Sequence, residues 1–94
     1  MPKAHEENGF VFSFYSNDHL PMHIHAKKGG AECVFLLGEV REVENEAGEV
    51  SLEVVTAPSI RENRGMPPAE VRRALDIVAA NQAQMLAKWR EHFE

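Results

Sequence analysis

The sequence predicts an α+β fold in which an antiparallel sheet of four or five strands carries one long C-terminal helix packed on one face. Two patterns predict this class: apolar residues recur at a period of two between residues 9 and 57, and an apolar stripe at helical spacing runs from residue 67 to 93. A chain of 94 residues is also the size of one domain. We therefore expect residues 1–94 to form a single domain, with its strands at about 9–57 and its helix at about 67–93.

The first half of the chain is typical of an aromatic strand followed by a hairpin. Phe10, Phe12 and Phe14 occupy every second position, which places three rings on one face of a strand. Residues 16–21 have turn chemistry, after which residues 22–27 alternate again until a lysine and two glycines interrupt the pattern. The strand expected next, at residues 31–37, is apolar at both parities and so should be covered on both faces.

The second half predicts another hairpin and then the helix. Residues 41–46 and 50–57 should pair around an acidic tip, with a solvated outer face. Residues 59–65 are expected to form a polar connection. The prolines that follow, with Glu70 in the first turn, are typical of a helix N-terminus.

One apolar stripe continues along the expected helix for about six turns. It consists of Val71, Leu75, Val78, Met85 and Trp89, with Leu86 and Phe93 beside it. A helix of about 25 residues would be about 38 Å long, which is longer than a small sheet requires. Trp89 and Phe93 therefore either close the core or contact a second copy of the chain, which would form a homodimer through the C-terminal helix.

The composition is that of an ordinary folded protein, with 44% hydrophobic and 27% charged residues. The uncharged stretches, residues 9–17 among them, are far shorter than the roughly 20 residues that cross a bilayer, and no apolar signal region follows Met1. The single cysteine, Cys33, rules out an internal disulfide and should be buried. We expect a cytoplasmic protein that does not contact a membrane.

The formal charge of −5 is concentrated in one segment, because residues 39–53 contain six glutamates and only Arg41 to compensate them. An acidic chain without a basic face is not expected to bind nucleic acid, since phosphate neutralisation supplies most of that affinity. The nearest approach to a basic patch is a group of arginines interrupted by two glutamates: Arg61, Arg64, Arg72 and Arg73, with Glu62 and Glu70.

The densest group of chemically active side chains lies between residues 18 and 26. Three of the five histidines, His19, His23 and His25, fall within seven residues. On a strand, His23 and His25 share a face with their Cβ atoms roughly 7 Å apart. Two imidazoles at this spacing can bind one metal ion, with Asp18 or His19 as a third ligand and with zinc or another divalent metal as the ion. Three protein ligands and an open position would be the catalytic arrangement.

Two other interpretations of these residues stay open. The histidines can exchange protons with a substrate or partner, because imidazole titrates near neutral pH. Alternatively the segment is only structural, with Asp18 accepting backbone N–H groups in a turn and Pro21 fixing the start of the next strand. Templates for serine hydrolases and nucleotide-binding loops are absent from the sequence. Whether the chain is an enzyme is left open.

The motif at residues 18–25, Asp-His-x-Pro-x-His-x-His, resembles that of a small prokaryotic family known as domain of unknown function 4160. The resemblance covers about residues 9–37 and 67–93, since the closing helix is also similar. The acidic hairpin at residues 39–57 looks longer than the connection that many relatives have.

The resemblance implies that the protein is the toxin of a prokaryotic toxin-antitoxin module and that a small cognate antitoxin protein binds it. Asp18, His19, His23 and His25 match the family motif, so they are the expected catalytic or target-binding residues. The alternative is a non-catalytic metal-binding or protein-interaction module, for which an acidic hairpin and an amphipathic helix are sufficient.

Overall fold

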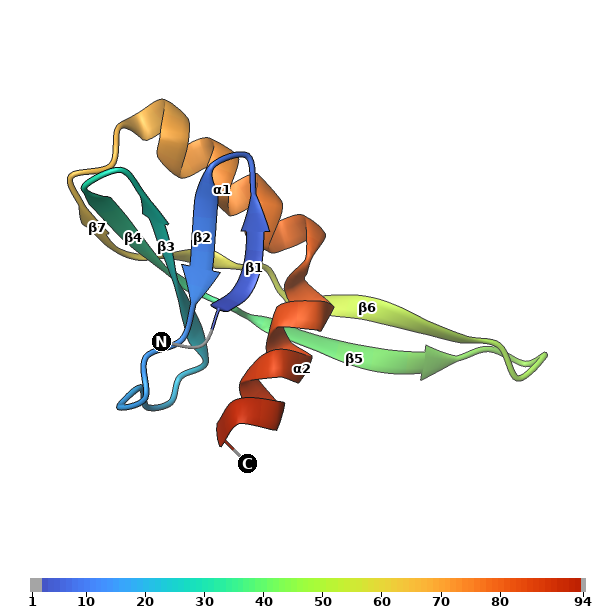
Figure 1. Cartoon of the computed structure of the whole chain (residues 1–94). Coiled ribbons are helices and arrows are strands. Elements are labelled where there is room, and N and C mark those ends of the chain that lie inside the picture. Colours follow the sequence, from blue (N-terminus) through green and yellow to red (C-terminus); the bar gives the residue numbers. More distant parts are fainter. Residues whose placement is uncertain (1–2, 94) are drawn as a thin grey trace.

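The computed structural model describes residues 3–93 and has an α+β fold, as predicted. The main sheet has five antiparallel strands in the order β1-β2-β3-β4-β7, and a separate two-stranded sheet, β5-β6, extends from the body (Figure 1). The strands are β1 (Lys3–Glu7), β2 (Phe10–Ser13), β3 (His23–Lys28), β4 (Ala31–Leu36), β5 (Glu39–Glu44), β6 (Val50–Thr56) and β7 (Ser59–Arg64), and the helices are α1 (Pro68–Ala80) and α2 (Gln82–Phe93).

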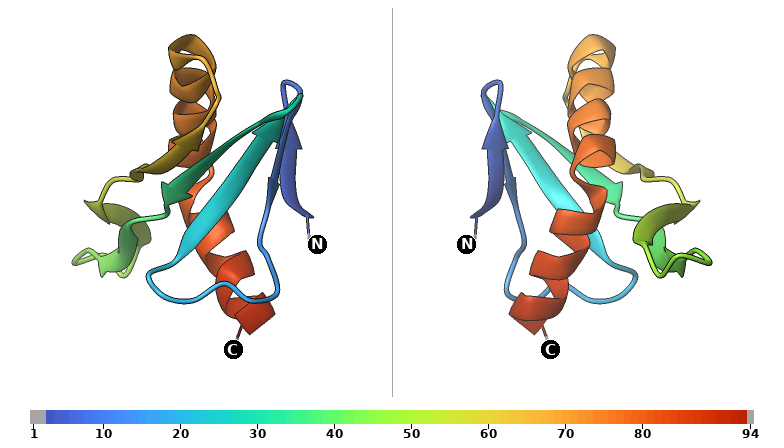
Figure 2. Two further views of the ribbon diagram at one scale, coloured as in Figure 1. Left: turned by 90° about the vertical axis from the view of Figure 1, so that its left-hand side faces the viewer. Right: turned by 90° about the vertical axis from the view of Figure 1, so that its right-hand side faces the viewer.

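The core lies between one face of the main sheet and the two helices. Alternation along β2 buries Phe10 and Phe12, and β3 adds Ile24 and Ala26 to the same cluster. Figure 2 shows α1 and α2 running one after the other along the twisted sheet. Burying a side chain of this size stabilises the fold by about 1.5–3 kcal/mol. The prediction that the helical segment packs on the aromatic face is therefore confirmed.

The C-terminal segment is divided at Asn81, so the prediction of one long helix is wrong. Asn81 has φ −120° and ψ 19°, and its Nδ2 donates to the carbonyl oxygen of Ile77 at 2.8 Å. Asparagine competes in this way with the backbone hydrogen bonds of a helix. The next residue, Gln82, is buried, and its Nε2 donates to the carbonyl oxygens of Leu37 and Thr56, each at 2.8 Å. The break thus lets α2 change direction and lets Gln82 hold both ends of the β5-β6 hairpin.

Two strands of the main sheet lie outside the segments predicted to be strands. The expected polar connection at residues 59–65 is largely strand β7, which pairs with β4, and β1 pairs with β2 at the other edge. Every residue of β7 is exposed, and β1 has one buried residue, Ala4. Edge strands of this kind are held by backbone hydrogen bonds, which leave no apolar period in the sequence.

The second predicted hairpin is confirmed as β5 and β6, but it forms its own sheet and does not extend the main one. At its tip, Oδ1 of Asn45 accepts two backbone N–H groups from across the turn. Figure 1 shows the hairpin projecting away from the helices. Val50, Leu52 and Val54 alternate along β6 and are 57–61% exposed. Adjacent exposed apolar side chains of this kind are typical of a contact surface.

The aromatic residues of α2 close the core. Trp89 is 3% exposed and packs edge-on against Phe14, with 5.5 Å between the ring centroids. Phe93 is partly buried against the same cluster. Of the two roles considered for these side chains, core closure is the one observed.

Two expectations drawn from composition concern burial and membranes. Cys33 is buried, and burial raises the pKa of its thiol. Neither helix within residues 3–93 is long and apolar enough to cross a membrane. The cytoplasmic location stays a prediction.

We expect Gly38→Ala to destabilise the protein far more than Gly48→Ala. Both glycines have a positive φ, +71° and +82°, which costs an L residue about 1–2 kcal/mol. A Cβ at Gly38 would also lie 2.1 Å from the carbonyl oxygen of Thr56 and 2.8 Å from Nε2 of Gln82, whereas at Gly48 the nearest atom is 3.8 Å away. The clash should add at least about 2 kcal/mol for Gly38 alone. Urea unfolding measures the free energy of unfolding of both variants. Equal losses of stability would contradict the close packing of Gly38 against Thr56 and Gln82.

Candidate metal centre

The candidate site lies on the face of β3 opposite the core. His23 and His25 alternate with the core residue Ile24, so the two imidazoles share a face as predicted. Both are nevertheless buried, at 5% and 7% exposed. The loop of residues 14–22 between β2 and β3 covers His25, and Trp89 of α2 packs against His23 with 5.3 Å between the ring centroids.

The loop presents Asp18 to the two imidazoles. The backbone N–H of Tyr15 donates to Oδ2 of Asp18 at 2.8 Å, and the N–H of Asp18 donates to the carbonyl oxygen of Tyr15 at 3.0 Å. This turn leaves Oδ1 facing the strand, 3.1 Å from Nε2 of His23 and 3.1 Å from Nε2 of His25. We call Asp18, His23 and His25 the histidine-aspartate cluster; all three were predicted as candidate metal ligands from the sequence.

The other ring nitrogen of each histidine is bound to an acceptor. Nδ1 of His23 donates to the carbonyl oxygen of Pro21 at 2.8 Å, and Nδ1 of His25 donates to Oε2 of Glu32 at 2.8 Å. Carbonyl and carboxylate oxygens only accept, so each Nδ1 carries a hydrogen. In a neutral imidazole the lone pair then lies on Nε2, which faces Asp18. With both imidazoles neutral, three electron-pair donors therefore converge, and all lie within 4.8 Å of one another. With His25 protonated, its Nε2–H donates to Oδ1 of Asp18 at 3.1 Å instead.

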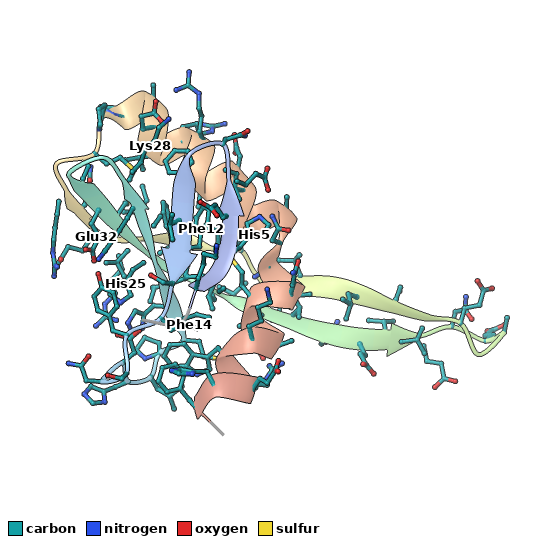
Figure 3. The ribbon with its side chains drawn as sticks, viewed as in Figure 1. His5, Phe12, Phe14, His25, Lys28 and Glu32 are labelled. Atoms are coloured by element: carbon teal, nitrogen blue, oxygen red, sulfur yellow. The ribbon has the colours of Figure 1, made fainter. Side chains whose placement is uncertain are left out.

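Tyr15 and Glu32 support His25, although neither was predicted as a site residue from the sequence. The rings of Tyr15 and His25 stack with 3.7 Å between centroids, and the Tyr15 hydroxyl donates to Oε1 of Glu32 at 2.9 Å. Figure 3 shows His25 and Glu32 side by side on neighbouring strands. A signal for Glu32 was present: in a hairpin that turns at two glycines, Lys27 lies opposite Glu32, which makes Glu32 a diagonal neighbour of His25.

Burial and hydrogen bonding act in opposite directions on the two carboxyl groups. Desolvation by burial would raise the pKa of Asp18, but hydrogen bonds from the Tyr15 N–H and from His25, with the charges of both cluster histidines, hold this pKa below its ordinary value. Desolvation likewise opposes ionisation of Glu32, but hydrogen bonds from His25 and Tyr15 lower the pKa overall. Both groups are therefore carboxylates at neutral pH.

A cavity of about 300 Å³ opens beside the histidine-aspartate cluster. The cluster lines one side, and Arg61 and Arg64 of β7 line another. His19 also borders the cavity, but its side chain is exposed and is not part of the cluster. Of the two residues considered as a third ligand, the geometry therefore favours Asp18 over His19.

A family match covers the whole cluster. Residues 9–57 match the family described as Domain of unknown function (DUF4160). The matched region includes the β5-β6 hairpin, whereas the resemblance seen in the sequence covers residues 9–37 and the helix. Searches of curated proteins and of solved structures gave no significant match.

We expect the free energy of unfolding, measured with a chelator present, to fall in acid through Asp18 and Glu32. Their folded-state pKa values are lowered, so their stabilisation is complete above the ordinary carboxyl pKa values of 3.8 and 4.5 and is lost as the pH falls below them. Glu32→Gln removes one of these contributions, so its stability should vary less with pH. Urea unfolding between pH 7 and pH 3 tests this, with Glu42→Gln on the exposed β5 as the control. A wild-type slope in Glu32→Gln would contradict the expectation.

Proposed function

This chain belongs to the family described as Domain of unknown function (DUF4160), and we propose that its histidine-aspartate cluster binds a divalent metal ion. One observation carries the proposal: Nε2 of His23 and Nε2 of His25 each lie 3.1 Å from Oδ1 of Asp18. When both imidazoles are neutral, lone pairs at that distance repel one another unless a cation lies between them. A metal ion satisfies all three atoms at once, which a single proton does not.

The donor set fits zinc or a similar divalent transition metal. Two imidazole nitrogens and one carboxylate oxygen are typical ligands of catalytic zinc and of non-haem iron(II). Ligand atoms around an ion at 2.0–2.2 Å are about 3.4 Å apart in a tetrahedral site. The two 3.1 Å separations in the cluster are close to this value.

The surroundings of the cluster also match those of metal-binding histidines. In such sites the second ring N–H donates to a carboxylate or a backbone carbonyl, which fixes the tautomer and the ring orientation. Glu32 has this role for His25, and the carbonyl of Pro21 has it for His23. The hydroxyl of Tyr15 in turn holds Glu32. Support for an ion thus extends beyond the three ligands.

The proposed activity is metal-dependent hydrolysis of a small substrate that enters the cavity. Structural zinc sites usually have four protein ligands, whereas the cluster supplies three from the described residues and borders a cavity. An ion in this position would polarise a bound oxygen atom and lower the pKa of a water ligand.

Zinc should bind the purified full chain at one ion per molecule. In isothermal titration calorimetry, replacing any member of the histidine-aspartate cluster by alanine should lower the zinc affinity more than about 100-fold, and Glu32→Gln should lower it about 10- to 100-fold. His19→Ala is the matched control, because this imidazole borders the same cavity outside the cluster. It should keep the wild-type affinity.

Two results would overturn the metal site: a wild-type chain that binds neither zinc nor iron(II), or an equal loss of affinity in His19→Ala and His25→Ala. NMR of the imidazole nitrogens then tests the proton-transfer alternative. In that alternative Nε2 of both His23 and His25 carries a hydrogen, and two imidazolium ions donate to Asp18.

A growth-inhibiting role, silenced by a small partner protein, is the biological setting that the family resemblance supports. The exposed apolar residues of β6 favour a protein partner, since Val50, Leu52 and Val54 lie uncovered on a projecting hairpin. No residue of the hairpin lines the cavity. A partner bound only to the hairpin would therefore leave the histidine-aspartate cluster unchanged. A longer partner could extend from the hairpin to the cavity.

Induced expression of the wild type in bacteria should therefore arrest growth. His25→Ala and Asp18→Ala should relieve the arrest, whereas His19→Ala should not, because it leaves the proposed ligands in place. Circular dichroism checks that each variant is folded. Normal growth on expression of the wild type would remove the growth-inhibiting role, and calorimetry would still decide the metal site.

A further inference from the structure

Strand β7 has a bulge at the wall of the cavity. Val34 of β4 pairs with Glu62 and the next residue, Phe35, pairs with Ile60, so Arg61 is an extra residue in the ladder. In a regular strand Arg61 and Glu62 would point to opposite faces. Both instead line the cavity, which is the effect of a bulge that redirects a side chain toward a site.

Of the two arginines in the cavity wall, Arg61 has the uncompensated charge. Arg64 contacts Glu62 and lies 3.8 Å from Glu32. Arg61 forms no ion pair with any residue between 3 and 93. Its planar guanidinium carries five N–H donors, and two of them can donate side by side to the oxygens of one oxyanion. Arg61 is exposed to solvent and is therefore free to bind an anion that enters the cavity.

We propose that the cavity binds a phosphoryl group and that Arg61 recognises it. The inference rests on the proposed metal site, because an ion on one wall and a guanidinium on the other would bind different oxygens of one anion. A phosphoryl group has three such oxygens, whereas a carboxylate has two. The volume of about 300 Å³ is at the lower end for ligand sites, so it suits a small phosphate ester better than a large cofactor.

The phosphoryl group belongs to a small molecule and not to a nucleic acid strand. The net charge of −5 and the exposed glutamates of β5 repel a polyanion, whose binding depends on many phosphate contacts. The cavity offers one free guanidinium, Arg61, which is sufficient for a single phosphate.

The test is a calorimetric titration of the zinc-loaded full chain with inorganic phosphate. Arg61→Ala should weaken phosphate binding at least about tenfold and leave the zinc affinity within about twofold of the wild type. Arg61→Lys keeps the charge but loses the planar fork, so it should bind phosphate with intermediate affinity. Arg72→Ala is the matched control, because Arg72 is an exposed arginine of α1 outside the cavity wall.

Acetate and a short RNA strand without terminal phosphates are the comparison ligands. Phosphate binding that exceeds both and depends on Arg61 supports the proposal. Equal phosphate affinity in the wild type and Arg61→Ala removes the role of Arg61, and tighter binding of the RNA removes the small-molecule assignment. Zinc binding is measured in a separate titration, and failure to bind zinc counts against the metal site. Phosphate binding that depends on Arg61 in the absence of zinc supports the anion site by itself.

Discussion

Strand β3 has different chemistry on its two faces, and the rest of the structure depends on that difference. One face contributes Ile24 and Ala26 to the core, and the other contributes His23 and His25 to the histidine-aspartate cluster. Because side chains alternate with a period of two, a slip of one residue would exchange the faces and place both imidazoles among the phenyl rings. Pairing with β2 on one side and β4 on the other fixes the register. The register of β3 thus fixes both the packing of the core and the geometry of the site.

The same hydrogen bonds stabilise the buried polar groups and orient them. A buried polar group without a partner costs about 1–3 kcal/mol, and this site buries two imidazoles and a carboxylate. The loop of residues 14–22 and Glu32 supply the partners that offset this cost. Those contacts also direct both Nε2 atoms toward Asp18. A substitution that alters the orientation of the cluster therefore also removes part of its stabilisation.

Local alternation and turn chemistry predicted the parts of the fold that depend on one strand or hairpin at a time: the aromatic face, the shared face of the two histidines and both hairpins. Tyr15 and Glu32 were not identified, because their roles depend on strand pairing and on how the loop folds back. The apolar stripe continues across the break at Asn81, whose position follows from the contact of Gln82 with distant carbonyl groups. Strand β7 has no alternation of apolar and polar residues that would predict it, because all of its residues are exposed.

The β5-β6 hairpin is held to the body at its base, where Gln82 binds the carbonyl groups that precede and end it, and it contributes nothing to the histidine-aspartate cluster. A two-stranded hairpin is marginally stable in water, so it can open locally while the main sheet stays folded. Substitutions along β6 therefore carry little cost for folding or for the geometry of the cavity. Over evolutionary time, the exposed surface of β6 and the histidine-aspartate cluster are free to diverge separately.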